Sequence, residues 1–301
     1  MDYKHKSMLT ESGLKSLQAL ISMIDEPDDS VYSSLKSQVL LYNRDALPTL
    51  KEAWMAATDL LVVSRLSELM DEINFRLIFN EMEAFLLGGS KGLTKAMFIV
   101  NKLVDKGFDD KLYQTKVELL FKDAWLEMNN NLTALEKIKV LNHIFFSIHK
   151  YNGNPDANEL TDSFFVAELM NSKVGNATSM GMLYLSIAQY LKLPVYGVNL
   201  PGHLILAYVD DRFKLKDVVK YRREDVLFYI NPFNRGAVFT DSEIELYIRQ
   251  VNLTPKEHYF LPAGNKMIIH RYLIELQKAC AREDDESTGN KIKQLLKLFE
   301  A

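Results

Sequence analysis

The sequence has little that could support a disulfide framework, a membrane segment or a secretory route. Its 301 residues include one cysteine, Cys280, so the chain cannot form an internal disulfide or a thiolate zinc site. No apolar run approaches the ~20 residues that a membrane-spanning helix requires. The opening residues, MDYKHKSMLTESG, carry charge with no apolar segment behind them, so we expect no secretory signal. These features predict a protein of the reducing cytoplasm.

Positive charge is also scarce. The 36 Lys and Arg residues are outnumbered by 40 Asp and Glu residues, which gives a formal net charge of -4. A nucleic-acid surface needs concentrated positive charge. The one basic cluster, Lys220-Tyr-Arg-Arg223, is followed at once by Glu224 and Asp225, which is typical of a solvated loop. We therefore expect no nucleic acid and no membrane among the partners.

The first part of the chain has the apolar spacing of helices from residue 14 to about residue 87. Two segments in it, DDSVYSSLKSQV from Asp28 and DLLVVSRLSELM from Asp59, share Asp, Val, Ser and Leu in register. Either two amphipathic helices agree by chance, or a helical unit is stacked on a copy of itself. The turn around Pro27 and the Leu47-Pro48-x-Leu50 pattern resemble HEAT-type helical repeats. Residues 1–78 are therefore expected to form a helical HEAT-like region.

The middle of the chain changes from helix to strand. The pattern Thr133-Ala-Leu-Glu136 predicts a capping box that opens a helix, and His143 and His149 on that helix are expected to pack or face solvent. A second helix, SMGMLYLSIAQYLK, is expected to begin at Ser179, a favourable cap residue. The segments PVYGVNL, HLILAYV and VLFYINPF follow, rich in β-branched and aromatic residues and separated by turn residues. They predict an antiparallel β-meander.

The last part of the chain returns to helix. Thr240-Asp-Ser-Glu243 and Thr254-Pro-Lys-Glu257 each predict a helix cap. The stretch REDDESTGN, residues 282–290, interrupts the final helical pattern, and its polarity predicts a solvated loop. The fold class is therefore α+β, with helices at both ends and the β-meander between them.

Three polar residues of the central region have the order of a catalytic triad. Ser179 is placed near a helix start, His203 at a strand start and Asn231 on a later strand. This is the order of nucleophile, base and orienting group, in which the helix terminus activates a thiol and the imidazole takes its proton. The thiol itself is missing from these positions, since Cys280 lies in the helical tail.

At these residues the sequence resembles the SirB-type branch of the transglutaminase-like superfamily. The resemblance covers about residues 80–250. It is carried by Gly175, Leu183-Tyr184, Leu193-Pro194-Val195, Gly197-Val198, Leu200-Pro201-Gly202-His203, Asn231-Pro232-Phe233 and Gly236. The tail segments IIHRYLIELQKAC and NKIKQLLKLFE are similar to the helical hairpin that follows the core in this branch. The resemblance implies a papain-like core at residues 79–250 and a helical tail at residues 251–301.

The resemblance also implies site residues. The family's Cys-His-Asp order places the cysteine near Ala177 or Ser179, the histidine at His203, and the aspartate where this chain has Asn231. An asparagine can orient an imidazole but cannot stabilise an imidazolium as a carboxylate does. The residues expected to shape the site are Gly175, Ala177, Pro201, Gly202, Pro232 and Phe233.

Two functions follow from these features. The first is a core that has lost thiol chemistry and binds a protein or peptide partner, with the N-terminal helices supplying added surface. The second is a hydrolase or acyl-transfer enzyme that uses Ser179, His203 and Asn231. In a third interpretation, compatible with the first, the His203 ring bonds a backbone carbonyl group and pins the Pro201-Gly202 turn. No Asp, Glu or His lies at ligand spacing from His203, so we expect no metal and no cofactor.

Overall fold

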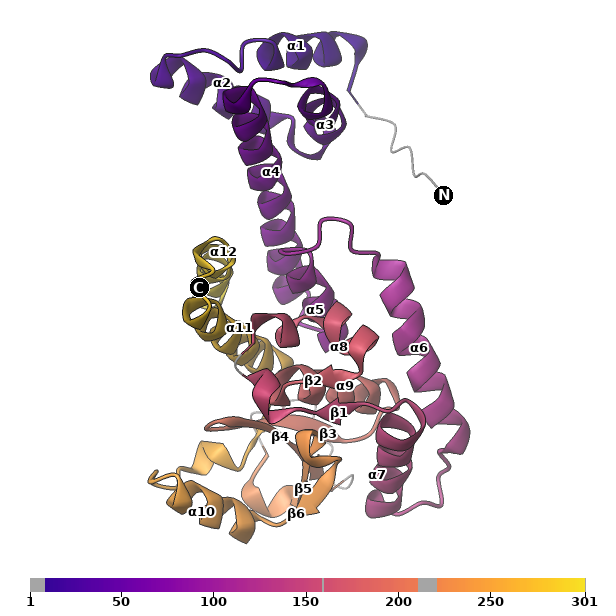
Figure 1. Ribbon diagram of the computed structural model, residues 1–301. Coiled ribbons are helices and arrows are strands. Elements are labelled where there is room, and N and C mark those ends of the chain that lie inside the picture. The colour runs from indigo at the N-terminus through magenta and orange to yellow at the C-terminus, as the bar shows by residue number, and fades with distance from the viewer. Residues whose placement is uncertain (1–8, 159, 211–220, 301) are drawn as a thin grey trace. The chain divides into compact units, whose positions relative to one another are not determined.

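The computed structural model describes residues 9–158, 160–210 and 221–300 (Figure 1). The chain divides into two compact units, which we call the N-terminal unit (Met1–Glu81) and the C-terminal unit (Met82–Ala301). Each unit is described by itself below. In the described part of the chain, no helix combines the length and the apolar character needed to cross a bilayer.

The N-terminal unit is helical, as predicted. It contains α1 (Glu11–Ile21), α2 (Asp29–Leu41), a short 3-10 turn η1 (Asn43–Ala46), α3 (Leu47–Ala56) and α4 (Leu60–Leu87), which continues past the end of the unit. One core joins these helices; its most buried members are Leu17, Ile21, Ile24, Val39, Leu40, Ala46, Leu50, Leu66, Leu69 and Ile73. The likeness to HEAT repeats stays a prediction.

The two similar segments of this unit, which begin at Asp28 and Asp59, have the same structural roles at matching positions. The Asp28 carboxylate accepts hydrogen bonds from the amides of Ser30 (2.8 Å) and Val31 (3.2 Å) at the start of α2. Asp59, its counterpart, accepts from the amides of residues 61 (2.8 Å) and 62 (3.1 Å) at the start of α4. The aligned leucines, Leu35 and Leu66, are both buried. The shared letters therefore mark equivalent N-caps and equivalent core positions.

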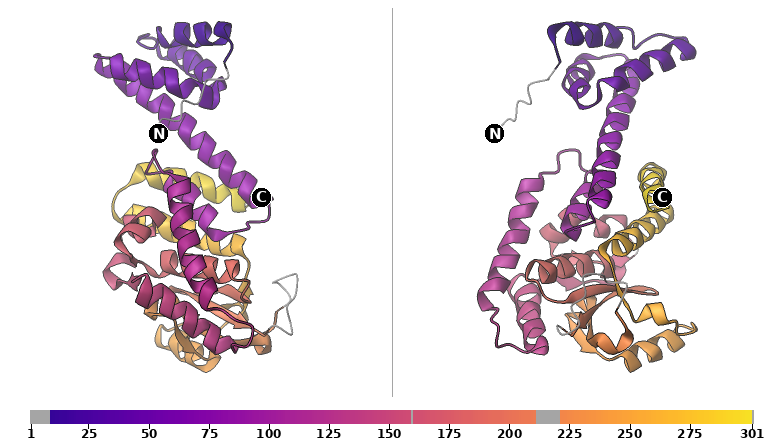
Figure 2. Two further views of the ribbon diagram at one scale, coloured as in Figure 1. Left: turned by 90° about the vertical axis from the view of Figure 1, so that its right-hand side faces the viewer. Right: turned by 180° about the vertical axis from the view of Figure 1, so that it is seen from behind.

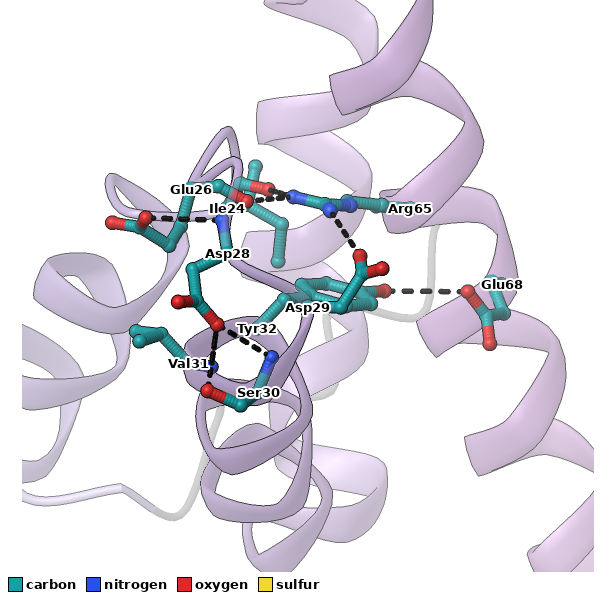
Figure 3. A network of polar contacts seen from close by, with 9 residues as sticks. All are labelled: Ile24, Glu26, Asp28, Asp29, Ser30, Val31, Tyr32, Arg65 and Glu68. Atoms are coloured by element: carbon teal, nitrogen blue, oxygen red, sulfur yellow. Dashed lines mark hydrogen bonds and ion pairs between the residues drawn. The ribbon is translucent and has the colours of Figure 1, made fainter.

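A buried arginine ties the start of α2 to α4 (Figure 3). The side chain of Arg65 donates from Nη1 to the carbonyl oxygens of Ile24 (2.9 Å) and Glu26 (2.6 Å). Its guanidinium carbon lies 3.9 Å from the centre of the Tyr32 ring, and Asp29 approaches Nη2 at 3.7 Å. Arg65 is 8% exposed, so its charge is held by carbonyl dipoles and an aromatic face as well as by one carboxylate.

The helices of the C-terminal unit surround one sheet. They are α5 (Leu93–Asn101), α6 (Asp110–Glu127), α7 (Ala134–Asn142), α8 (Val166–Ser172), α9 (Ala177–Tyr190), α10 (Asp241–Gln250), α11 (Asn265–Arg282) and α12 (Glu286–Leu296). A π-helical segment η2 (His143–Ile148) extends α7. Short 3-10 turns are η3 (Pro155–Asn158), η4 (Thr161–Phe164), η7 (Arg223–Asp225), η8 (Pro232–Asn234), η9 (Glu257–Tyr259) and η10 (Lys297–Phe299).

The sheet is antiparallel, as the predicted meander requires. Its strand order is β6-β5-β4-β3-β7, with β3 (Val195–Leu200), β4 (His203–Val209), β5 (Val226–Asn231), β6 (Ala237–Phe239) and β7 (Pro262–Ala263). A separate parallel pair joins β1 (Asn152–Gly153) to β2 (Val174–Gly175). Strand β7 comes from residues 251–301, so this part of the chain contributes an edge strand as well as the two helices α11 and α12.

The two faces of the sheet are covered by different helices (Figures 1 and 2). On one face, Ile205 and Ala207 of β4 share a core cluster with Ile244 and Ile248 of α10. On the other face, Leu204 lies against Gly181 of α9. The same side of β3 meets α11, since Gly197 lies against Ile268. Helix α10 thus covers one face of the sheet, and α9 and α11 cover the opposite face.

Several local predictions are confirmed, and three are wrong. The capping boxes at Thr133 and Thr240 are present. Thr254 caps no helix, because only the short turn η9 follows it. The stretch 282–290 is not a loop, because the Asp285 carboxylate accepts a hydrogen bond from the Thr288 amide and starts α12. The predicted start of a helix at Ser179 is also displaced, as the next subsection describes.

The basic cluster is held by acidic side chains where the structure describes it. The Arg223 guanidinium bonds Asp241 (2.9 Å) and Glu245 (2.6 Å) of α10, and Lys220 lies outside the described residues. Arg223 therefore ties η7 to α10.

His149, expected to pack or face solvent, bonds the Asp123 carboxylate at 2.8 Å.

Replacing Arg65 with alanine should destabilise the N-terminal unit. The substitution leaves two carbonyl oxygens without their charged donor, and such hydrogen bonds contribute about 1.5–3 kcal/mol. The free energy of unfolding, measured by denaturant titration with circular dichroism, should fall by about 2–4 kcal/mol. Arg76→Ala is the matched control, because among the described residues Arg76 pairs with Glu72 alone, on the same helix surface, and exposed pairs are worth ~0–1 kcal/mol. Equal losses for both variants would contradict the assignment.

Candidate functional site

The N-terminus of α9 is capped by Asn176, not by Ser179 as predicted. The Asn176 side-chain oxygen accepts hydrogen bonds from the amides of Thr178 (3.0 Å) and Ser179 (2.7 Å). Its amide nitrogen donates to the Ser163 hydroxyl at 2.9 Å. The helix begins at Ala177, two residues before the predicted start at Ser179. Asparagine is as favourable a cap as serine, and Asn176 precedes Ser179 in the sequence. Ser179 therefore lies inside the first turn of the helix.

The hydroxyl of Ser179 is turned into the protein. It donates to the Ser163 carbonyl oxygen at 2.8 Å, and Ser179 is 0% exposed. Gly175 leaves the space for it: a Cβ at residue 175 would come within 2.9 Å of the Ser179 oxygen and also press on Leu169. Ala177 is the first residue of α9 and is buried. Ser179 and Gly175 thus belong to the packing between η4, β2 and α9.

His203 begins β4 directly after the Pro-Gly turn. The turn needs Gly202, whose φ is +77°, and the Tyr247 hydroxyl of α10 donates to the Pro201 carbonyl oxygen at 3.1 Å. The ring of His203 meets the ring of Tyr247 edge to face, with the centres 5.3 Å apart. The imidazole therefore packs beside the residue that holds the turn in place.

Strand geometry places His203 on the α10 face of the sheet. Side chains alternate between the two faces of a strand, and Ile205, two residues along β4, faces α10. The contact between His203 and Tyr247 agrees with this assignment. Helix α9, which carries Ser179, covers the opposite face through Gly181 and Leu204. Among the described residues, the Ser179 hydroxyl donates to the Ser163 carbonyl oxygen, and no hydrogen bond joins it to the His203 ring.

The third residue of the predicted triad caps a turn. The Asn231 side-chain oxygen accepts a hydrogen bond from the Asn234 amide at 3.2 Å and begins η8. Pro232 follows as the buried first residue of this turn. Phe233 packs closely on Gly153 of β1, where a Cβ would approach its ring within 2.7 Å. Asn231, Pro232 and Phe233 thus fix the corner between β5 and β1.

A buried polar network, absent from the sequence predictions, lies beside the α9 terminus. Arg271 of α11 donates to the Asn199 side-chain oxygen (2.7 Å) and to the Leu200 carbonyl oxygen (2.6 Å) of β3. The Arg271 guanidinium also pairs with Glu275, one turn along α11, at 2.7 Å. The Thr178 hydroxyl in the first turn of α9 donates to the other Glu275 oxygen. We call Thr178, Asn199, Arg271 and Glu275 the α11 network; it links α9, α11 and β3.

The only visible signal for this network in the sequence is the spacing of Arg271 and Glu275. An i,i+4 pair of opposite charge on a helix usually lies at the surface. Here the arginine is 7% exposed, because it caps a carbonyl group at the end of β3. The β3 partners of Arg271 and the Thr178 partner of Glu275 lie about 70 to 100 residues earlier in the chain, so short-range patterns do not reveal them.

The surroundings of His203 favour its neutral form. Burial lowers the pKa of the imidazole below its ordinary value, the Arg271 guanidinium lowers that pKa further, and Glu275 opposes both effects. Within the described residues, the His203 Nδ1 atom is buried without a hydrogen-bond partner. In the same part of the chain, no three His, Cys, Asp or Glu side chains are grouped so that they could hold a metal ion. The site therefore offers a neutral imidazole beside a buried ion pair.

The comparisons with known proteins agree with this architecture. The family model described as "Transglutaminase-like superfamily" matches residues 111–274. This match covers α9, the meander and the first part of α11, including Arg271. The chain belongs to the transglutaminase-like superfamily.

The bacterial relatives have low sequence identity to this chain, but each match covers about two thirds of both proteins or more. The chain is 24% identical to a UPF0162 protein of Buchnera aphidicola subsp. Schizaphis graminum, over 68% of this chain and 72% of that protein. It is 22% identical to Protein SirB1 of Salmonella typhimurium, over 69% of this chain and 73% of that protein. It is also 22% identical to UPF0162 protein YchA of Escherichia coli strain K12, over 64% and 68%. No solved structure shows a significant match. The predicted resemblance to SirB-type proteins is confirmed.

Replacing Glu275 with glutamine should destabilise the C-terminal unit. The amide can still accept the Thr178 hydroxyl, but the buried Arg271 loses its counter-charge. Breaking a fully buried pair costs about 3–5 kcal/mol; with a quarter of the Glu275 side chain exposed (26%), we expect about 1–3 kcal/mol in the free energy of unfolding. Glu127→Gln, at the exposed end of α6, is the control and should change it by less than ~0.5 kcal/mol. An unchanged Glu275→Gln variant would show that the ion pair does not contribute.

The pKa of His203 predicts a specific loss of stability in acid. Because the folded state lowers this pKa, the unfolded chain binds the proton more readily. The stability contributed by neutral His203 is present above about pH 6.5 and is lost as the pH falls below that value. The free energy of unfolding of the parent chain should therefore decrease, relative to that of His203→Gln, between about pH 7 and pH 5. A difference that is constant over this range would contradict the shift.

Proposed function

We propose that this chain is a non-catalytic member of its superfamily that binds a protein or peptide partner. The observation that carries the proposal is the orientation of Ser179, whose hydroxyl is fully buried and donates to the Ser163 carbonyl oxygen. A serine nucleophile depends on a base within hydrogen-bond reach, since its hydroxyl is hardly ionised at neutral pH. His203, the candidate base, instead packs on Tyr247 at the α10 face.

The α9 terminus supports the same proposal. An active site of this order would need free amides and a reactive group at the start of the helix. Here the Asn176 side chain accepts hydrogen bonds from the amides of residues 178 and 179, and the Glu275 carboxylate accepts one from the Thr178 hydroxyl. The positions where the resemblance places a cysteine, Ala177 and Ser179, are both buried. The chain's own polar groups thus occupy the place where a substrate would be activated.

A surface at the start of β5 supports the binding role. A half-open cavity of about 440 Å³ is lined there by Arg223, Glu224, Val226, Leu227, Phe228, Tyr229, Thr240 and Asp241. Strand β6 pairs only with Tyr229–Asn231, so no described strand covers the outer edge of Val226–Phe228. An open strand edge beside a cavity suits an extended peptide, which adds main-chain hydrogen bonds and places a side chain in the cavity. We propose this edge as the peptide site.

The N-terminal unit adds further contact surface in this proposal. Met55 at the end of α3 is 72% exposed and Leu60 at the start of α4 is 85% exposed. Large apolar side chains exposed at the surface are available to a protein partner. We also propose a cytoplasmic location, because the one cysteine, Cys280, is free and buried, and disulfides are rare in reducing compartments.

Labelling with a fluorophosphonate probe tests the absence of catalysis. The probe reacts with serines that a base activates, so we expect no labelling of Ser179 or Thr178 when the protein is mapped by mass spectrometry. Ser179→Ala and His203→Ala should lower the melting temperature, because each loses buried contacts, without removing any hydrolysis of ester or amide substrates. Labelling of Ser179 that disappears in a folded His203→Ala variant would establish the serine enzyme instead.

Selection from a displayed peptide library tests the binding role. Peptides selected on the full chain should bind with saturable affinity, measured by fluorescence anisotropy. Leu227→Asp, in the lining of the cavity, should weaken binding at least tenfold, whereas Leu246→Asp, at an exposed leucine of α10 outside the cavity lining, should leave the affinity unchanged. If no peptide is selected, or if both variants bind alike, the proposed peptide site is wrong.

A further inference from the structure

Helix α6 carries a second apolar stripe on its exposed side. Its buried side is formed by Tyr113, Val117, Leu120 and Ala124. Three more leucines, Leu112, Leu119 and Leu126, are 51%, 53% and 64% exposed. In the left view of Figure 2, α6 runs along the face of the C-terminal unit nearest the viewer. The packing of this unit therefore does not account for the three leucines.

The spacing of the three leucines indicates the shape of what covers them. They recur every seven residues, and seven residues of an α-helix return to the same side within about 20°. They therefore form one line along α6, with about 10.5 Å between successive leucines. A line with this repeat matches the side-chain spacing of another α-helix. The line therefore has the geometry to pack against a helix that runs alongside α6.

The charges beside the stripe make α6 complementary to itself. A two-fold axis at Leu119 sets Leu112 against Leu126 of a second copy and Leu119 against its own equivalent. On the flank of α6 that faces the rest of the C-terminal unit, this arrangement brings Lys116 beside the second copy's Asp123. By the same symmetry, Asp123 lies beside the second copy's Lys116. Lys122 lies on the other flank, where it meets the second copy's Thr115. The antiparallel pairing thus joins opposite charges and apposes no like charges along the stripe.

We propose that the chain forms a homodimer through antiparallel pairing of α6 with α6 of a second copy, centred on Leu119. The two inner charges remain available for this contact. Asp123 bonds His149 through one carboxylate oxygen, and a third of its side chain (33%) is exposed. Lys116 bonds the Asn171 side chain and lies over the Tyr113 ring, which fixes it on the body side of the stripe. The proposal is independent of the peptide site on β5.

Sedimentation velocity on the full chain tests the dimer. The parent protein should show a monomer–dimer equilibrium that depends on concentration, with the dimer dominant in concentrated samples. Leu119→Glu should shift the equilibrium to monomer, because it places two carboxylates at the two-fold axis. Leu246→Glu is the control: it changes an equally exposed leucine on α10 and should leave the equilibrium unchanged. A parent protein that stays monomeric throughout would overturn the proposal and leave the stripe to a helix of another protein.

Cysteine cross-linking distinguishes the antiparallel arrangement. Under mild oxidation Leu119→Cys should form a disulfide-linked dimer, whereas the parent chain should not, because Cys280 is 0% exposed. Leu112→Cys alone should give no cross-link, but a mixture of Leu112→Cys and Leu126→Cys chains should. Efficient cross-linking of Leu112→Cys with itself would indicate parallel pairing, and failure of Leu119→Cys to cross-link more than Leu246→Cys would exclude the α6 contact. Circular dichroism confirms that each variant is folded.

Discussion

The buried guanidinium of Arg271 is the interaction on which the C-terminal unit depends most. It enters from α11 and satisfies the last carbonyl group of β3 and the Asn199 side chain. Its counter-charge, Glu275, reaches the first turn of α9 through Thr178. A buried charge is tolerated only when such partners surround it. The position of α11 on the sheet and the start of α9 are therefore coupled through one side chain.

This coupling changes the chemistry available at the α9 terminus. In a thiol enzyme of this order, the positive end of the helix dipole stabilises a thiolate. In this chain the Glu275 carboxylate lies beside Thr178 in the first turn and adds the negative charge that the helix terminus favours. The cap of Asn176 satisfies the amides of residues 178 and 179. The terminus is electrostatically complete without a reactive group, which agrees with the burial of Ala177 and Ser179.

The sequence predicted the parts of this structure that short-range chemistry decides. The succession of helix, meander and helix follows from periodicity and turn residues, and Gly202 is needed at a positive φ whatever the surroundings. The sequence could not reveal which of several cap residues starts a helix. Asn176 rather than Ser179 caps α9, and Asp285 starts α12 within a stretch whose polarity indicated a loop. Whether Ser179 and His203 can meet depends on which face of the sheet each element covers. The contacts of Arg271 and Glu275 join segments about 70 to 100 residues apart.

A histidine at the start of β4 has a structural reason that does not require catalysis. The Pro201-Gly202 turn is held by the Tyr247 hydroxyl, and an aromatic ring at residue 203 covers Tyr247 edge to face. The imidazole is small enough to fit there and, when neutral, avoids a second positive charge near Arg271, in keeping with its lowered pKa. A lysine or arginine at this position would bring an obligatory charge to the same place. The contact with Tyr247 and the proximity of the buried guanidinium thus give residue 203 a structural role.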